Sequence, residues 1–261
     1  MTNSMIRYDA RKILKGQWFK IGLILLIYTA IVGFINIAGS NPAGMYDVLV
    51  NDANVVEYYN NLDDSIFSTL AGMVEFYMTV GICVMLINVV KSEKYTGMML
   101  FQDMRLGFKA IALGIIISIF TVAWSMLFII PGIIKAFSYS MSFYVLAQNP
   151  DMPILECIAE SQKIMYGHKI DLFCMRMVFV GWKLVITIGA IVPTAVGVSL
   201  AMSFGELIYS KLIMLGVRVV AAIIGQLVIQ PYEKTSETVF YMYVSGQDYK
   251  RPDMVGETGD L

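Results

Sequence analysis

Residues 124–182 decide how this chain folds, and they read WSMLFIIPGIIKAFSYSMSFYVLAQNP followed by DMPILECIAESQKIMYGHKIDLFCMRMVFVGW. A first apolar run breaks at Pro131-Gly132, and a second run leads from there to Asn149-Pro150. A polar segment follows, and a third apolar run begins at Leu172. Two apolar runs on either side of a Pro-Gly break, with a polar helix at their base, predict a hairpin within a membrane.

The composition extends this interpretation to the whole chain, because 57% of the residues are hydrophobic and only 15% are charged. A globular protein is closer to half apolar and about a quarter charged. The excess does not indicate one buried core, since it is divided into runs of about twenty residues that match a hydrocarbon thickness of about 30 Å. A net charge of -1 gives no indication of a nucleic-acid partner.

These runs predict an all-α, polytopic transmembrane helix bundle of about six spans. The expected spans are residues 19–38, 70–90, 110–130, 133–147, 172–198 and 207–229. The fourth is short, so spans three and four could form either a full or a re-entrant hairpin. We expect residues 1–245 to form a single transmembrane domain and the polar residues 246–261 to be a disordered cytoplasmic tail.

The lysines and arginines predict the orientation, because cytoplasmic loops carry an excess of them. They gather before span one, between spans two and three, between spans four and five, and after span six. The other loops have none outside the helix ends, and the loop of residues 39–67 is acidic. We therefore expect both termini to be cytoplasmic. The apolar run of span one is longer than the hydrophobic region of a cleavable signal peptide and has a long polar lead-in, so we expect it to be retained.

Amphipathic segments are expected at the cytoplasmic surface, over residues 5–18, 153–166 and 233–244. The first has Ser4 as its expected N-cap. Three basic residues share one face of it: Arg7, Arg11 and Lys15. This helix either lies on an anionic leaflet or only enforces the topology.

Short motifs are distributed over most of the chain: Pro131-Gly132, Tyr139-Ser140-Met141, Asn149-Pro150, Ser161, Met165, Gly167-His168-Lys169, Phe173, Gly181-Trp182, Pro231-Tyr232 and Phe240-Tyr241. Together they resemble a family of bacterial integral membrane proteins called domain of unknown function 975. The lead-in Leu14-Lys15-Gly16 with Trp18 is also similar, whereas the separation of Trp182 from Pro231 is longer than in the family. The resemblance implies a bacterial plasma-membrane protein and implies no reaction, since the family has no established activity.

The sequence offers little chemistry for catalysis. His168 is the only histidine and has no set of partners at metal-ligand spacing. Cys83, Cys157 and Cys174 form no CxxC pair, so we expect small buried side chains rather than disulfides or a zinc site. No nucleophile, phosphate-binding or metallopeptidase motif occurs in a usable context. We therefore expect no enzyme activity, no metal and no cofactor.

Charged residues inside the expected spans are the main functional candidates, because such a charge costs several kcal/mol unless it is paired or hydrated. Lys183 and Arg218 lie near the middle of spans five and six and could bind an anionic lipid or a small anionic solute. Alternatively, span five begins later, and Lys183 simply reaches the cytoplasmic interface. Glu75 and Lys211 lie at similar depths, and we predict that they pair.

Two classes of function remain. The first is a non-enzymatic multi-pass membrane protein that is a structural or regulatory partner of another component of the cell envelope. The second is a transporter or lipid-handling protein that binds an anion within the bundle. A wet cavity around Lys183 and Arg218 would favour the second class, whereas a packed bundle with these groups paired would favour the first.

Overall fold

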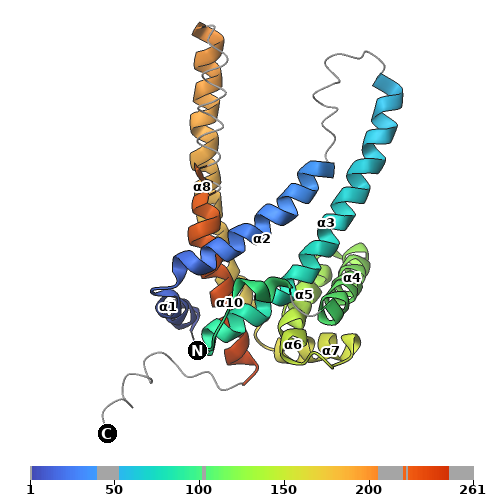
Figure 1. Ribbon diagram of the computed structural model, residues 1–261, viewed down its shortest axis with the longest axis vertical. Helices are drawn as coiled ribbons and strands as arrows, with labels where there is room; N and C mark the ends of the chain where they lie inside the picture. Colours follow the sequence, from blue (N-terminus) through green and yellow to red (C-terminus); the bar gives the residue numbers. More distant parts are fainter. Residues whose placement is uncertain (1, 40–52, 102–103, 205–219, 222, 247–261) are drawn as a thin grey trace. The chain divides into compact units, whose positions relative to one another are not determined.

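The structure is a computed structural model that describes residues 2–39, 53–101, 104–204, 220–221 and 223–246. These residues form helices and connecting turns, which confirms the expected all-α fold (Figure 1). The chain divides into two compact units, Leu26–Tyr166 and a unit made of Met1–Leu25 and Gly167–Leu261. The single domain over residues 1–245 stays a prediction, and residues 247–261 of the expected tail lie outside the described residues.

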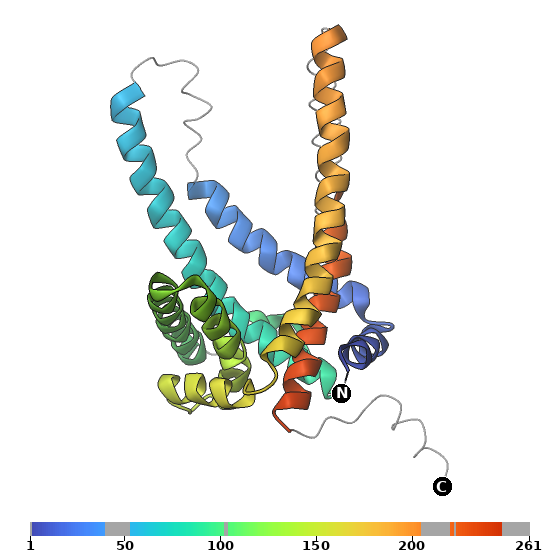
Figure 2. The same cartoon turned by 180° about the vertical axis from the view of Figure 1, so that it is seen from behind.

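The unit Leu26–Tyr166 contains a hairpin of two helices and the elements that pack on it. Its elements are most of α2 (Trp18–Gly39), α3 (Ala53–Val90), the 3-10 helix η2 (Gly97–Phe101), α4 (Met104–Leu127), α5 (Ile129–Tyr139), α6 (Ser142–Gln148) and α7 (Ile154–Ile164). Helices α4 and α5 pack side by side as the predicted hairpin (Figure 2). Helix α3 packs against α4 and η2, and α6 packs against α3 and α7.

The break between α4 and α5 falls at Phe128, so its prediction at Pro131-Gly132 is wrong by a few residues. Phe128 has an extended backbone, with φ -156° and ψ 138°, and Pro131 lies in the first turn of α5. Proline is tolerated there because the N–H groups of a first turn have no helical acceptor. Gly132 allows the hairpin to close tightly, since a Cβ at this position would lie 2.7 Å from the Cα of Ser125.

Helix α7 coincides with the amphipathic segment predicted over residues 153–166. Pro153 stands directly before its first residue. Gly167 follows with φ +83°, a conformation that suits glycine just after a helix end. The face that carries Cys157 and Ile158 is buried within the protein. Local sequence signals therefore located this helix correctly.

The second unit is organised around a polar helix. It contains α1 (Asn3–Leu14), the start of α2, α8 (Lys169–Phe204), the π-helical segment η3 (Gly225–Ile229) and α10 (Gln230–Val244). Helix α10 packs against α1 and α8, and Figures 1 and 2 both show it alongside α8. The prediction of an amphipathic surface helix over residues 233–244 is wrong, because every residue from Thr235 to Met242 is buried.

Helix α1 has the two faces predicted for it, with a different cap. Thr2 precedes the first helical residue, so Ser4 lies inside the helix and is not its N-cap. Of the predicted basic face, Arg11 and the C-cap residue Lys15 are exposed, whereas Arg7 is half-buried. Three apolar side chains are at most 1% exposed: Ile6, Ala10 and Leu14. This apolar face is covered by α10, so it cannot insert into lipid as an amphipathic surface helix would.

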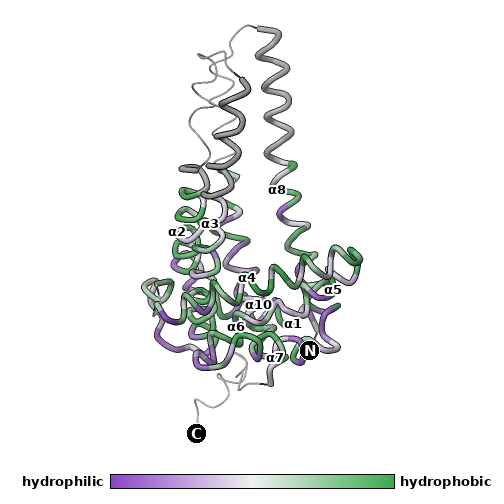
Figure 3. The backbone as a smooth tube through the Cα atoms, turned by 90° about the vertical axis from the view of Figure 1, so that its right-hand side faces the viewer, coloured by the Kyte–Doolittle hydropathy of each residue, from purple (hydrophilic) through white to green (hydrophobic). Residues whose placement is uncertain are grey.

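Within the described residues, five helical stretches are long and apolar enough to cross a membrane: Trp18–Ile35, Phe67–Val90, Met104–Leu127, Ile129–Gln148 and Lys169–Gly189. They correspond to expected spans one to five, and expected span six lies mostly outside the described residues. Helix α3 begins within the acidic loop expected over residues 39–67, since Ala53 is its first residue. Hydrophilic and hydrophobic residues mix along the first half of α8 (Figure 3). The 36 residues of α8 would measure about 54 Å, well beyond the hydrocarbon thickness.

Candidate functional site

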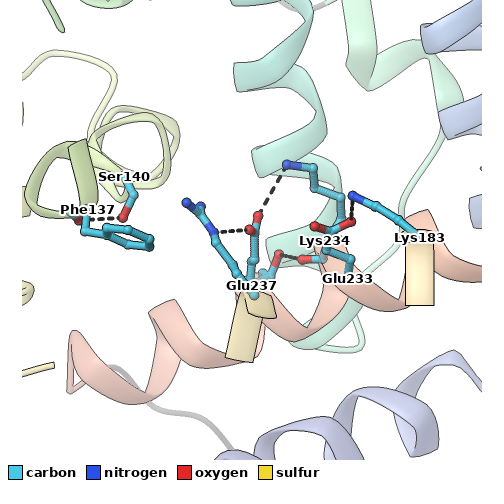
Figure 4. A network of polar contacts seen from close by, with 8 residues as sticks. Phe137, Ser140, Lys183, Glu233, Lys234 and Glu237 are labelled. Atoms are coloured by element: carbon cyan, nitrogen blue, oxygen red, sulfur yellow. Dashed lines mark hydrogen bonds and ion pairs between the residues drawn. The ribbon is translucent and has the colours of Figure 1, made fainter. Parts of the chain in front are cut away.

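A buried carboxylate on α10 joins this helix to α8. The side chain of Glu237 is 5% exposed, and it accepts hydrogen bonds from Nε of Arg176 at 2.7 Å and from Nζ of Lys234 at 3.3 Å (Figure 4). Burial by itself would raise the pKa of this carboxyl, but the charges of Lys234 and Arg176 and their hydrogen bonds lower it from 4.5 to about 2. Glu237 is therefore ionised at neutral pH and ties the two helices together.

A second ion pair lies one turn earlier on α10. Nζ of Lys183 on α8 lies 2.5 Å from Oε2 of Glu233, and Figure 4 shows the two side chains pointing toward each other. Arg176 comes before Lys183 on α8, whereas its partner Glu237 comes after Glu233 on α10. The two helices are therefore antiparallel here, and pairs at two levels fix how they align along each other.

Tyr232 gathers contacts from α1, α2 and α8. Its hydroxyl accepts a hydrogen bond from Nε of Arg11 at 2.9 Å, and the guanidinium lies 5.3 Å from the ring centroid. The ring is 5.1 Å from that of Phe179 in an edge-on arrangement and 5.9 Å from that of Trp18. Aromatic pairs and cation–π contacts of this kind each contribute about 0.5–1.5 kcal/mol. Tyr232 thus holds the N-terminal residues against α8 and α10.

The start of α2 supplies a hydrogen bond that Pro231 cannot make. Pro231 has no N–H, so the carbonyl of Leu227, four residues earlier, lacks the donor that an α-helix would provide. The indole Nε1–H of Trp18 donates to this carbonyl at 3.1 Å. Gly22 permits the close approach, since a Cβ there would lie 3.0 Å from the same oxygen.

We expect Trp18→Phe to lower the free energy of unfolding by about 1–2 kcal/mol, because it keeps an aromatic ring and leaves the Leu227 carbonyl without its donor. Trp182→Phe is the matched control, since Trp182 is largely exposed on α8. The control should change stability by less than about 0.5 kcal/mol. Unfolding of the purified protein in detergent measures both, and equal effects of the two variants would contradict the role of the indole N–H.

In the unit Leu26–Tyr166, one hydroxyl bridges the interruption between α5 and α6. Ser161 of α7 accepts a hydrogen bond from the backbone N–H of Met141 at 3.2 Å and donates one to the carbonyl of Ser138 at 2.8 Å. The side chain of Ser161 is fully buried. Since helix ends leave backbone groups without partners, this serine replaces the partners that the interruption removes.

We expect Ser161→Ala to destabilise the protein by about 1–3 kcal/mol, because it leaves a buried N–H and a buried carbonyl without this partner. Ser140→Ala is the control, since the hydroxyl of Ser140 donates only within its own turn, to the carbonyl of Phe137 at 2.8 Å. Thermal unfolding should show a clearly smaller loss for the control. An Ser161→Ala variant as stable as the parent would rule out the bridging role.

The predicted site residues are only partly within the described structure. Lys183 is paired with Glu233, while Arg218 and Lys211 lie outside the described residues. Glu75 lies on an exposed part of α3, and its pairing with Lys211 stays a prediction. The structure therefore describes one of the two basic residues proposed to bind an anion, and that residue has a carboxylate partner.

The carboxylates that pair with α8 were not recognised from the sequence. Glu233 and Glu237 belong to the segment that the pattern assigns to the surface, where carboxylates need no partner. The sequence nevertheless contained an indication of these ion pairs. Glu233 and Glu237 are four residues apart, so both can face basic residues that share one face of an antiparallel helix. Arg176 and Lys183 share one face of α8, which is the face that meets these acids.

Within the described residues, no group of three or more histidine, cysteine or acidic residues is arranged to hold a metal ion. Nδ1 of His168 instead lies 3.4 Å from the carboxylate of Asp171, and both side chains are well exposed. Cys83 and Cys157 are buried, as expected for small apolar residues. Cys174 is exposed, so the same expectation is wrong for it.

The family model described as "Protein of unknown function (DUF975)" matches residues 65–248. The chain belongs to this family. The match covers more than half of the chain and confirms the resemblance based on its motifs, and it begins after α1 and α2. No curated protein and no solved structure matches the chain.

Three motifs of this DUF975 protein lie where helices are interrupted or joined, whereas Phe173 and Gly181-Trp182 lie within α8 and Phe240-Tyr241 within α10. Ser161 meets the backbone on both sides of Ser140 at the α5–α6 interruption. Pro231-Tyr232 is the site where α1, α2 and α8 converge on α10. At Asn149-Pro150, the carbonyl of Pro150 accepts a hydrogen bond from Nζ of Lys109 at 2.6 Å. These three motifs thus hold irregular backbone in place.

Proposed function

We propose that this protein is a non-enzymatic, multi-pass protein of the bacterial plasma membrane, and that it is a structural or regulatory partner of another envelope component. The observation that supports this proposal is the pairing of ionisable side chains with each other. Arg176 pairs with Glu237 and Lys183 with Glu233, so these groups hold α8 and α10 in one arrangement. A scaffold with fixed helices is suited to presenting a constant surface to a partner.

Helix α4 offers an apolar surface for such a partner. Exposed apolar side chains run along it: Phe108, Ile115, Ile119 and Val122. In a bilayer this surface contacts either lipid or the helices of another protein, and helix association in lipid depends on close packing of such surfaces. The surface belongs to the part of the chain that matches the family.

Photo-crosslinking in native membranes tests the proposal. A photoreactive amino acid at Ile115 or Ile119 is expected to give one discrete protein adduct, which mass spectrometry would identify. The same amino acid at Leu113, which is fully buried on the same helix, is the control and should give no such adduct. If the exposed positions of α4, and Val185 on α8, yield only lipid adducts, the partner role is rejected.

A transporter or lipid-handling role is the second candidate. The side chain of Lys183 stays 51% exposed in its ion pair, and the residue lies in the candidate span Lys169–Gly189. Lys183 and Arg218 would then bind an anionic lipid or a small anionic solute. Native mass spectrometry decides between the candidates, because Lys183→Gln and Arg218→Gln variants that keep the bound anionic lipids of the parent would exclude this role.

A further inference from the structure

Basic and aromatic side chains from three helices meet at one level of α10. Arg11 of α1 bonds to Tyr232, and Lys183 of α8 pairs with the next residue, Glu233. Trp18, whose ring lies 5.9 Å from that of Tyr232, opens the first candidate membrane span. Tryptophan and tyrosine beside lysine and arginine are typical of the membrane–water interface. This level therefore has the side-chain composition of a region that contacts lipid headgroups.

Helix α1 reaches this level with its basic face outward. Its apolar face is covered by α10, and Arg11 and the C-cap residue Lys15, four residues apart, are both exposed. Side chains at this spacing are neighbours, with their Cβ atoms about 6 Å apart. The only acidic residue among residues 2–20 is Asp9, which is 3% exposed. The C-terminal end of α1 thus presents neighbouring exposed cations, among them Arg11 and Lys15, and no exposed carboxylate of its own.

The guanidinium of Arg11 is held ready for an anion. Its Nε donates to the hydroxyl of Tyr232, which orients the planar group and leaves its other N–H donors available. Arginine recognises phosphate through paired N–H donors of this kind, and lysine adds a point charge. Lys15 lies three residues before Trp18, the first residue of the candidate span Trp18–Ile35.

We propose that Arg11 and Lys15 bind the phosphate of an anionic phospholipid headgroup at the base of α2. The contact is electrostatic, because the apolar face of α1 is buried against α10 and cannot enter the bilayer. A phospholipid is the occupant favoured over a soluble anion, since the site adjoins the first residue of a membrane span. The proposal goes beyond the proposed function and holds whether or not α4 binds another protein.

The test uses the full chain in nanodiscs of phosphatidylcholine that contain phosphatidylglycerol, followed by native mass spectrometry of the lipid that stays bound. Lys15→Gln is expected to reduce bound phosphatidylglycerol about fivefold, the effect of one basic residue near an anionic surface. Arg11→Gln should reduce it at least as much. Tyr232→Phe should also reduce the bound lipid, because it removes the hydroxyl that orients Arg11. Since this variant keeps every charge, its effect would come from the orientation of Arg11.

Two further variants separate headgroup binding from loss of fold or of charge in general. Lys15→Arg keeps the charge and should retain the lipid. Lys91→Gln removes an exposed charge at the end of the candidate span Phe67–Val90 and should also retain it. The proposal is overturned if Lys15→Gln and Arg11→Gln retain phosphatidylglycerol like the parent, or if Lys91→Gln loses as much. It is equally overturned if inorganic phosphate displaces the lipid at constant ionic strength, which would assign the site to a soluble anion.

Discussion

Replacing Glu237 by alanine is expected to lower the free energy of unfolding by about 3–5 kcal/mol, the usual cost of removing one partner from a buried ion pair. The variant takes away the carboxylate that Arg176 and Lys234 share. Glu160→Ala is the matched control, because its partner Lys163 is exposed and lies 3.5 Å away. Exposed pairs contribute about 0–1 kcal/mol, so the control should unfold almost like the parent. Denaturant unfolding in detergent measures the difference. Similar losses of stability in the two variants would contradict a stabilising role of the buried ion pairs of Glu237.

The lowered pKa of Glu237 also predicts how the free energy of unfolding depends on pH in the acid range. The pKa of Glu237 is lowered from 4.5 to about 2 in the folded chain, so the folded state takes up its proton at lower pH than the unfolded state. Its stabilisation is therefore complete above about pH 4.5 and is lost as the pH falls toward 2. Glu237→Gln should abolish this part of the pH dependence. Parallel stability curves for parent and variant in that window would show that Glu237 does not titrate as described.

Replacing Gly81 by valine is expected to cost about 3 kcal/mol, at the upper end of the range for overpacking. A Cβ at Gly81 would lie 2.5 Å from the carbonyl oxygen of Met99 and 2.7 Å from the Cα of Leu100. Both atoms belong to the backbone of η2, so no side-chain rotation can relieve the clash, and η2 must leave α3.

Gly72→Val is the control for this substitution, because Gly72 is on the same helix and a Cβ there would meet nothing within 4 Å. Both substitutions change helix propensity alike, so their difference isolates the contact with η2. The melting temperature in detergent should fall much further for Gly81→Val. Equal melting temperatures would mean that η2 does not pack on α3 as described.

Features with local causes could be predicted from the sequence. The limits of α7 followed from Pro153 and Gly167, whose backbone preferences act within one turn. The α4–α5 hairpin was also predicted, but its break was assigned to Pro131. That residue fits inside the first turn of α5, so the chain turns at Phe128 instead.

Features that depend on distant partners could not be predicted. The hydrogen bond between Arg176 and Glu237 joins residues 61 apart, and Ser161 lies 20 residues from Met141. Helix α10 was misassigned to the surface because its hydroxyl groups look like solvent-facing residues. Ser236 and Thr238 instead donate to carbonyls one turn back in their own helix, which lets polar side chains be buried.

Reporter fusions after Asp52 and after Tyr249 test most directly whether the chain crosses the membrane with both termini in the cytoplasm. Asp52 follows the first expected span, and Tyr249 follows the last. The distribution of lysine and arginine predicts that a reporter that works only outside the cytoplasm is active when fused after Asp52. A reporter that works only inside the cytoplasm should be active when fused after Tyr249. Reporters on the same side of the membrane would contradict this arrangement.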